Sequence, residues 1–263
     1  MQPLSVPELH DDDRPIGRVL TRREVLAALG AGAGVTIVAA CMPASLATLA
    51  PSASASNTTT APTGTGSVAL PSCVVKPELT EGPYFVDEKL DRSDIRSDTN
   101  SGNLAQGVPL ALTFAVARVS GSQCVAFEGA LVDVWHCDAA GLYSDVAQNA
   151  TVGQNFLRGY QVTDASGRAA FTTIYPGWYS GRTVHIHFKI RSDPEASSGL
   201  EFTSQLFFDE GVTAEVYAQE PYSSRGAQDV SNASDSIFSS ELVLVPTRSG
   251  SGYAASFEIG VVV

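Results

Sequence analysis

The sequence predicts an all-β fold, a single β-sandwich domain in the second part of the chain. Short runs of β-branched and aromatic residues alternate with Gly, Pro, Asp and Ser after Cys73. Turn pairs such as Ser120-Gly121 separate these runs, and no long amphipathic helix is evident, although 213–218 could form a short one. The candidate strands are 110–119, 130–135, 169–174, 183–190, 204–208, 240–245 and 253–263. Several short strands separated by turns are typical of a sandwich.

Two segments are expected before this domain. Residues 1–41 contain Arg22-Arg23 and then an apolar run at 25–40, a pattern typical of a twin-arginine export signal. The run is too short and too small-sided for a comfortable membrane span. Residues 42–72 are mostly Ala, Ser, Thr, Pro and Gly, so we expect a flexible tether that buries no core. The folded domain is therefore expected over 73–263.

Cys41 suggests how an exported chain could stay at the cell surface. It follows Val38-Ala39-Ala40, which resembles a bacterial lipobox. A lipid on Cys41 would tether the chain to a membrane without spanning it. The alternative is an ordinary cleavage site that precedes a cysteine. We expect an exported protein, extracellular or at the cell surface, that uses the twin-arginine route.

The net charge and the cysteine spacing limit the classes of partner and metal site that this chain can have. The formal net charge is −12, which argues against a nucleic-acid partner. Cys73, Cys124 and Cys137 lie in the expected domain, and their spacings fit no zinc pattern. In an oxidising compartment three cysteines predict one disulfide and one free thiol, with the pairing left open.

The strongest chemical signal is the pair His185 and His187. They are separated by one residue in a candidate strand, so both side chains leave the same face. Tyr179 precedes them beyond the Pro176-Gly177 turn, and Arg182 lies in between. Two imidazoles on one face make half of a first-row metal site. A ferric ion could also hold a tyrosine as phenolate, although the free phenol has a pKa of about 10. The simpler interpretation is a polar face of a sandwich strand.

The residues around this pair widen the pattern. They are Thr80-Glu81-Gly82-Pro83-Tyr84, the stretch from Trp135 to Tyr143, Arg158-Gly159, Thr163-Asp164, Gly167, Phe171, Pro176-Gly177, Tyr179, Arg182, His185, His187 and Phe188. Together they resemble the intradiol ring-cleavage dioxygenases of the secreted type. These are non-haem Fe(III) enzymes that include protocatechuate 3,4-dioxygenase and catechol 1,2-dioxygenase. The resemblance covers roughly residues 73–208, most of the expected domain.

The resemblance implies a metal site carried by long loops. Its expected Fe(III) ligands are Tyr143, Tyr179, His185 and His187. Tyr143 matches the ligand that stays bound, whereas Tyr179 matches the one that leaves and accepts a substrate proton. The implied reaction inserts O2 between the two hydroxyl-bearing carbons of a catechol-type diol and yields a cis,cis-muconate.

The resemblance also implies residues around the iron. Arg182 matches the arginine that stabilises carbanionic character on the substrate ring, and Gln205 matches a glutamine beside the ligands. Pro83 and Tyr84 would wall the substrate pocket. Trp178 is most simply a packing residue, although it could edge that pocket.

The chain departs from the family in places that affect the substrate. Cytoplasmic relatives usually have Ala-Asn where this chain has Cys137-Asp138, and they have a longer connection between Tyr179 and His185. The substrate is therefore left open among catechol, protocatechuate, hydroxyquinol and larger catechols. The helical dimerisation segment of catechol 1,2-dioxygenases is missing, so the assembly state is open, with a homodimer as one candidate.

Two other classes of protein are alternatives. A non-catalytic, surface-displayed binding module would suit the tether equally well but would not need this set of side chains. An Fe(II) oxygenase with two histidines would need a carboxylate ligand and no tyrosines. Three neighbouring residues are not expected to be ligands: His136, Asp138 and Tyr175.

Overall fold

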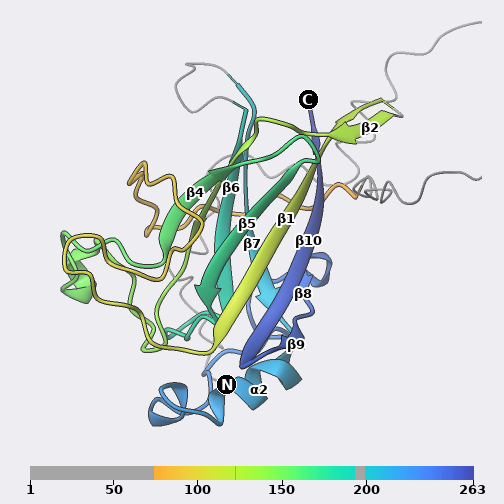
Figure 1. Cartoon of the computed structure of the whole chain (residues 1–263). Coiled ribbons are helices and arrows are strands. Elements are labelled where there is room, and N and C mark those ends of the chain that lie inside the picture. The colour runs from red at the N-terminus through yellow and green to blue at the C-terminus, as the bar shows by residue number, and fades with distance from the viewer. Residues whose placement is uncertain (1–73, 122, 193–198) are drawn as a thin grey trace, which may run out of the picture. The chain divides into compact units, whose positions relative to one another are not determined.

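The computed structural model describes residues 74–121, 123–192 and 199–263, which form two packed β-sheets (Figure 1). The expected all-β sandwich is confirmed. The first sheet contains β2 (Gln123–Ala126), β1 (Pro109–Ser120), β10 (Gly252–Val262), β9 (Thr247–Ser249) and β5 (Arg168–Ile174). The second has the order β4 (Arg158–Val162), β3 (Leu131–Trp135), β6 (His185–Arg191), β7 (Glu201–Phe208) and β8 (Val243–Leu244).

The core lies between the inner faces of the two sheets. Phe114 on β1 and Phe188 on β6 meet there, with ring centroids 5.2 Å apart. Both side chains are fully buried, as are Ile186 and Ile190, which share the inner face of β6. Burial of each such side chain stabilises the fold by about 1.5–3 kcal/mol. The alternation of side chains along β6 therefore sends its odd-numbered residues to the other face.

That outer face of the second sheet carries polar side chains under a covering segment. His185, His187, Lys189 and Arg191 follow one another along β6 on this face. The segment 79–92, here called the strap, crosses it, and the backbone N–H of Leu79 donates to the carbonyl of Thr203 on β7. The outer face is thus shielded by the strap.

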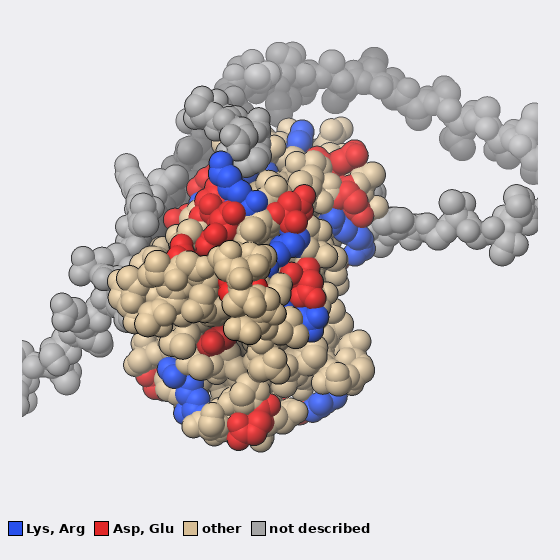
Figure 2. Space-filling view, turned by 60° about the vertical axis from the view of Figure 1, so that its left-hand side comes forward, with Lys and Arg blue, Asp and Glu red and all other residues tan. Residues whose placement is uncertain are grey.

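Ion pairs attach the strap to the outer face. Lys189 pairs with Glu81 of the strap and with Glu201. Arg191 pairs with Asp87 of the strap at 3.3 Å and with Asp133 at 2.7 Å. On the face shown in Figure 2, acidic and basic side chains are interspersed.

Most expected strands are present, with shifted ends. The run 240–245 contains only the two-residue β8, preceded by a 3-10 turn, Ser240–Leu242. The strands β2, β4 and β9 were not expected. The sequence of β4, Arg-Gly-Tyr-Gln-Val, lacks an apolar alternation, and its pairing with β3 forms it.

The short helix α2 (Glu210–Tyr217) overlaps the expected helical stretch 213–218 and begins three residues earlier. Asp209 caps it by accepting the backbone N–H groups of Gly211 and Val212. Two 3-10 turns, Ala147–Asn149 and Tyr222–Ser224, lie in the long loops. Within the described ranges, no helix combines the length and apolar character needed to cross a membrane.

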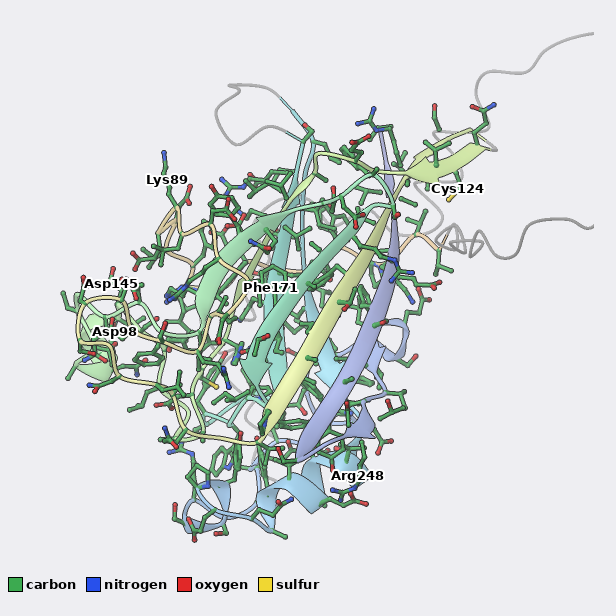
Figure 3. All side chains as sticks on the ribbon, viewed as in Figure 1. Lys89, Asp98, Cys124, Asp145, Phe171 and Arg248 are labelled. Atoms are coloured by element: carbon green, nitrogen blue, oxygen red, sulfur yellow. The ribbon has the colours of Figure 1, made fainter. Side chains whose placement is uncertain are left out.

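The cysteines of the described part agree with the predicted combination of one disulfide and one free thiol. Cys124, which Figure 3 labels on β2, is disulfide-bonded. Cys137 is a free thiol and is 2% exposed, so it is not the partner of Cys124. The expected export signal at 1–41, Cys41, the tether at 42–72 and Cys73 lie outside the described residues.

Candidate metal centre

Four side chains from three separate segments meet on the outer face of the second sheet. His185 Nε2 lies 3.0 Å from His187 Nε2, 3.4 Å from Tyr143 Oη and 3.3 Å from Tyr179 Oη. The two histidines come from β6, whereas both tyrosines come from loops. The structure therefore brings together the four side chains that the resemblance grouped.

The tautomer of His185 shows what these atoms offer. Its Nδ1 lies 2.7 Å from the carbonyl oxygen of Thr183, which can only accept, so Nδ1 carries the proton. Nε2 is then an unprotonated nitrogen with one lone pair, and two phenols and His187 all face it. One lone pair cannot accept three good hydrogen bonds. A cation held between deprotonated ligands resolves this surplus of donors.

The spacing of the four atoms also fits a metal ion. Two ligand atoms about 2.1 Å from a shared ion lie about 3.0–3.4 Å apart at bond angles of about 90–110°. The distances from His185 Nε2 fall in this range. Among the described residues, no group of three or more His, Cys, Asp or Glu could hold a metal. The four converging side chains differ from such clusters because two of their donors are tyrosine hydroxyls.

Burial keeps the two imidazoles neutral. His185 and His187 are 3% and 0% exposed, and burial lowers the pKa of each well below its ordinary value. The charge of Arg182 lowers both further. A neutral imidazole is the form that binds metals. His187 Nδ1 has no hydrogen-bond partner within the described residues.

A tight turn places Tyr179 beside His185. The Gly177 N–H donates to the carbonyl of Asp138, and a Cβ at Gly177 would lie 2.4 Å from that oxygen. Only glycine allows this approach of two loops. Two further tyrosines stabilise the same turn. The Tyr217 hydroxyl donates to the carbonyl of Pro176, and the Tyr222 hydroxyl donates to the carbonyl of Tyr175.

Tyr143 is held by residues that the sequence did not point to. Its backbone N–H donates to Asn149 Oδ1 at 2.8 Å, and its carbonyl accepts from Thr151 Oγ1 at 2.6 Å. Ala150, between them, has a φ of 56°, an uncommon value for a residue other than glycine. Asx and Thr side chains are frequent in such loops, so composition alone could not single out these two.

Arg182 lies beside the four side chains in a fully buried network. Its Nε donates to Asp235 Oδ2 at 2.9 Å, and its Nη2 donates to Gln205 Oε1 at 2.7 Å. Gln205 faces His187 across the pair β6–β7 and donates to the carbonyl of Thr80 in the strap. Asp235, whose side chain is fully buried, was not expected at the site.

Aromatic rings pack against the four side chains. Tyr84 of the strap stacks on Tyr143, with centroids 4.6 Å apart, and meets Tyr179 edge-on at 5.8 Å. Trp135 lies parallel to His187, with centroids 5.0 Å apart and an angle of 9°. Tyr84 thus covers both tyrosines, whereas Trp135 fixes the plane of one imidazole.

The other residues named from the sequence have contacts of their own. The Trp178 indole donates to the carbonyl of Gly226 and stacks under Arg225, and Pro83 is exposed. His136 is bound to Thr173 Oγ1 and the Cys137 carbonyl, and burial lowers its pKa to about 4. The remaining two have local partners: Asp138 accepts backbone N–H groups of its own loop, and the Tyr175 hydroxyl meets Thr213.

A separate pocket of about 820 Å³ does not contain the four side chains. It is lined by the loop that carries Asp98, by Asp138 and by Arg225. Figure 3 shows Asp98 and Asp145 in loops at one side of the sheets. The candidate metal centre therefore rests on the chemistry of its four side chains and not on the size of a pocket.

Comparison with known proteins defines the class. A family model described as Dioxygenase matches residues 80–219, more than half of the chain. This range contains all four side chains and Arg182. Together with the relatives below, it shows that the chain belongs to the intradiol ring-cleavage dioxygenase family.

Three relatives illustrate the range of the similarity. Chlorocatechol 1,2-dioxygenase of Pseudomonas putida is 33% identical over 150 residues, which cover 50% of this chain and 53% of that protein. An intradiol ring-cleavage dioxygenase from Tetranychus urticae is 29% identical, with a TM-score of 0.62 over 72% of this chain and 94% of the other. The dioxygenase domain of a carbohydrate-binding fusion from Streptomyces sp. SirexAA-E is 28% identical, with a TM-score of 0.53, over 72% and 99%. The chain spans about half the length of the curated relatives it matches.

Proposed function

We propose that the protein is a non-haem Fe(III) intradiol dioxygenase that cleaves catechol-type diols with O2 to cis,cis-muconate-type products. The observation that carries the proposal is the convergence of Tyr143, Tyr179, His185 and His187 on one point, in a chain of this family. A non-catalytic binding module would not need two neutral imidazoles and two phenols arranged around one lone pair.

The four side chains are the proposed iron ligands. Two phenolates would balance most of the charge of a ferric ion, and neutral imidazole nitrogens suit iron as well. The ion would supply a binding point for both catechol oxygens and electronic coupling between the ring and O2.

The two tyrosines have different surroundings, which supports different roles. Tyr143 is 1% exposed and its backbone is fixed on both sides. Tyr179 is only partly buried and lies in the short turn before His185. Tyr179 is therefore the residue placed to release its position and take a proton at Oη from a catechol hydroxyl, as a general base.

Arg182 supplies positive charge to the substrate ring. Its guanidinium is fully buried and held on two sides by Asp235 and Gln205, so its direction is fixed before substrate arrives. A preorganised charge in a water-poor site acts strongly on charge that develops during reaction. Gln205 serves as the residue that orients Arg182, and Tyr84 as a wall that excludes water.

Metal analysis with absorption spectroscopy tests the proposal. Protein expressed with ample iron should contain one Fe(III) per chain, show a red-brown tyrosinate charge-transfer band, and consume O2 with catechol. Zinc or no metal in that preparation would contradict the proposal, because a binding module or an Fe(II) site would be pale.

We also propose export by the twin-arginine route, with anchoring through a lipid on Cys41. The disulfide at Cys124 supports an oxidising compartment. Fractionation of the native host and mass spectrometry of the mature N-terminus would test both parts. A chain that remains in the cytoplasm with Met1 intact would contradict them.

A further inference from the structure

Arg158 is a buried cation that the proposed chemistry has not used. Its side chain is 2% exposed. Among the described residues no carboxylate forms an ion pair with it, and its Nη1 has no hydrogen-bond partner there. A buried charge without a counter-charge costs several kcal/mol or so. We therefore expect Arg158 to have a function nearby that offsets this free-energy cost.

The guanidinium of Arg158 is attached to the residue that follows Tyr143. Its Nη2 donates to the carbonyl of Ser144 at 2.6 Å, and its Nε donates to Ser144 Oγ at 2.9 Å. The Ser144 hydroxyl in turn donates to the carbonyl of Phe156 at 2.6 Å. Arg158 therefore clamps the chain directly after the tyrosine.

The strands place Arg158 on the same sheet as the histidines. Arg158 faces Trp135 across the pair β4–β3, and Trp135 faces His187 across the pair β3–β6. Leu157, immediately before Arg158, is fully buried with a φ of 56°. This conformation is strained for a bulky residue and persists only where the surroundings enforce it. The fold thus bears strain at the entrance to β4.

The charges around Arg158 point in the same direction. Burial lowers its pKa to about 10, and a phenolate at Tyr143 would oppose this lowering more strongly than Glu88 or Asp145. An iron-bound Tyr143 phenolate would therefore be the main counter-charge near this buried cation.

We propose that Arg158 is a positioning residue of the metal centre. Through Ser144 it fixes the loop of Tyr143, and its fixed positive charge limits how strongly the Tyr143 phenolate donates to iron. The inference rests on the proposed function, since it assumes that Tyr143 is an iron ligand. It concerns a residue that touches neither substrate nor metal.

The test compares the iron-loaded protein with Arg158→Met and Arg158→Lys. Without the cation, the phenolate electrons lie higher in energy, so the charge-transfer maximum of Arg158→Met should move to longer wavelength. Iron loss to a chelator should become about 10- to 100-fold easier, as is typical when a partner of a metal ligand is removed. Arg158→Lys keeps the positive charge but loses the paired guanidinium donors that bind Ser144. Its charge-transfer band should therefore stay in place while iron is lost faster than from the wild type.

Arg92→Met is the matched control. Arg92 is a partly buried arginine that donates to backbone carbonyls of Arg158, Ser97 and Asn155 but not to Ser144. The Arg92→Met substitution should lower the thermal stability without moving the charge-transfer band. An Arg158→Met band that coincides with wild type, or an Arg158→Lys band displaced from it, would overturn the inference. If Arg158→Met does not fold, the lysine variant decides alone. A colourless wild type would instead refute the proposed function.

Discussion

Arg182 and Asp235 form an ion pair in which both side chains are completely buried, with Nε 2.9 Å from Oδ2. The two residues are 53 positions apart in the chain. The same carboxylate oxygen of Asp235 also accepts the backbone N–H of Thr183 at 2.9 Å. Asp235 therefore fixes the Arg182 guanidinium, which is the proposed positive charge beside the substrate ring. It also fixes the turn that leads into the two histidines.

Removing Arg182 should affect rate and stability together. Arg182→Met is expected to retain iron and colour but lose activity about 100- to 1,000-fold, as is typical for a preorganised donor. Because Asp235 stays buried without its cation, the free energy of unfolding should fall by about 3–5 kcal/mol. Steady-state kinetics and denaturant unfolding measure the two effects. Arg248→Met, at an exposed pair with Glu215, is the control and should change neither. Normal turnover of Arg182→Met would assign Arg182 a purely structural role.

The two tyrosines should respond differently to replacement by phenylalanine. Tyr143→Phe removes a buried ligand that stays bound, so colour and turnover should both fall sharply. Tyr179→Phe should leave a coloured iron site but slow catechol binding, because the group that accepts the proton is gone. Stopped-flow spectra of catechol binding compare the variants. Identical behaviour of the two would contradict the separate roles.

Asp133 should make stability depend on pH in an unusual direction. Burial raises its pKa to about 6, and this exceeds the opposite effect of its ion pair with Arg191. Since the folded protein binds this proton more tightly than the unfolded chain, the stabilisation is full below about pH 4 and is lost as pH rises through 6. Relative to Asp133→Asn, wild type should lose about 3 kcal/mol or less between pH 4 and pH 7.

Unfolding of both proteins by denaturant across this pH range checks the sign. The comparison with Asp133→Asn cancels the other titrating groups, and Arg191 keeps Asp87 as a partner in the variant. A difference that grows in favour of wild type with rising pH would mean that the ion pair outweighs desolvation.

Substrate tolerance should be broad. Only five residues separate Tyr179 from His185, so this connection contributes little wall. Tyr84 of the strap is the ring that covers both tyrosines, whereas Tyr217 and Tyr222 are buried under the turn as hydrogen-bond donors. We expect catechol, hydroxyquinol and substituted catechols all to be cleaved, because an apolar wall separates ligands by only about 1–3 kcal/mol per methylene.

A series of catechols with growing ring substituents measures this tolerance through O2 uptake and product identification. Tyr84→Ala should further relax the preference against bulky substituents without loss of iron. Rejection of bulky catechols by orders of magnitude in the wild type, unrelieved in Tyr84→Ala, would show that another segment closes the site.

Local pattern was enough to predict the class of fold and the main strands. The alternation that buries Ile186, Phe188 and Ile190 also requires His185 and His187 to share the opposite face, because the side-chain period of a strand is two. Both histidines, Tyr179 and Arg182 therefore followed from adjacent positions and a turn. The membership of Tyr143 in this group of side chains was predicted only from the family resemblance, since Tyr143 lies 42 positions before His185.

Tertiary structure alone decided what surrounds these side chains. Asp235 reaches Arg182, Ser144 receives Arg158, and the strap lays Tyr84 over both tyrosines. None of these partners is near in sequence or marked by a periodic pattern. Their positions depend on long loops whose conformations are fixed by hydrogen bonds to distant backbone groups, and a local pattern carries no information about such contacts. The shape of the strand β4 has the same origin, because its pairing with β3 outweighs its weak intrinsic preference.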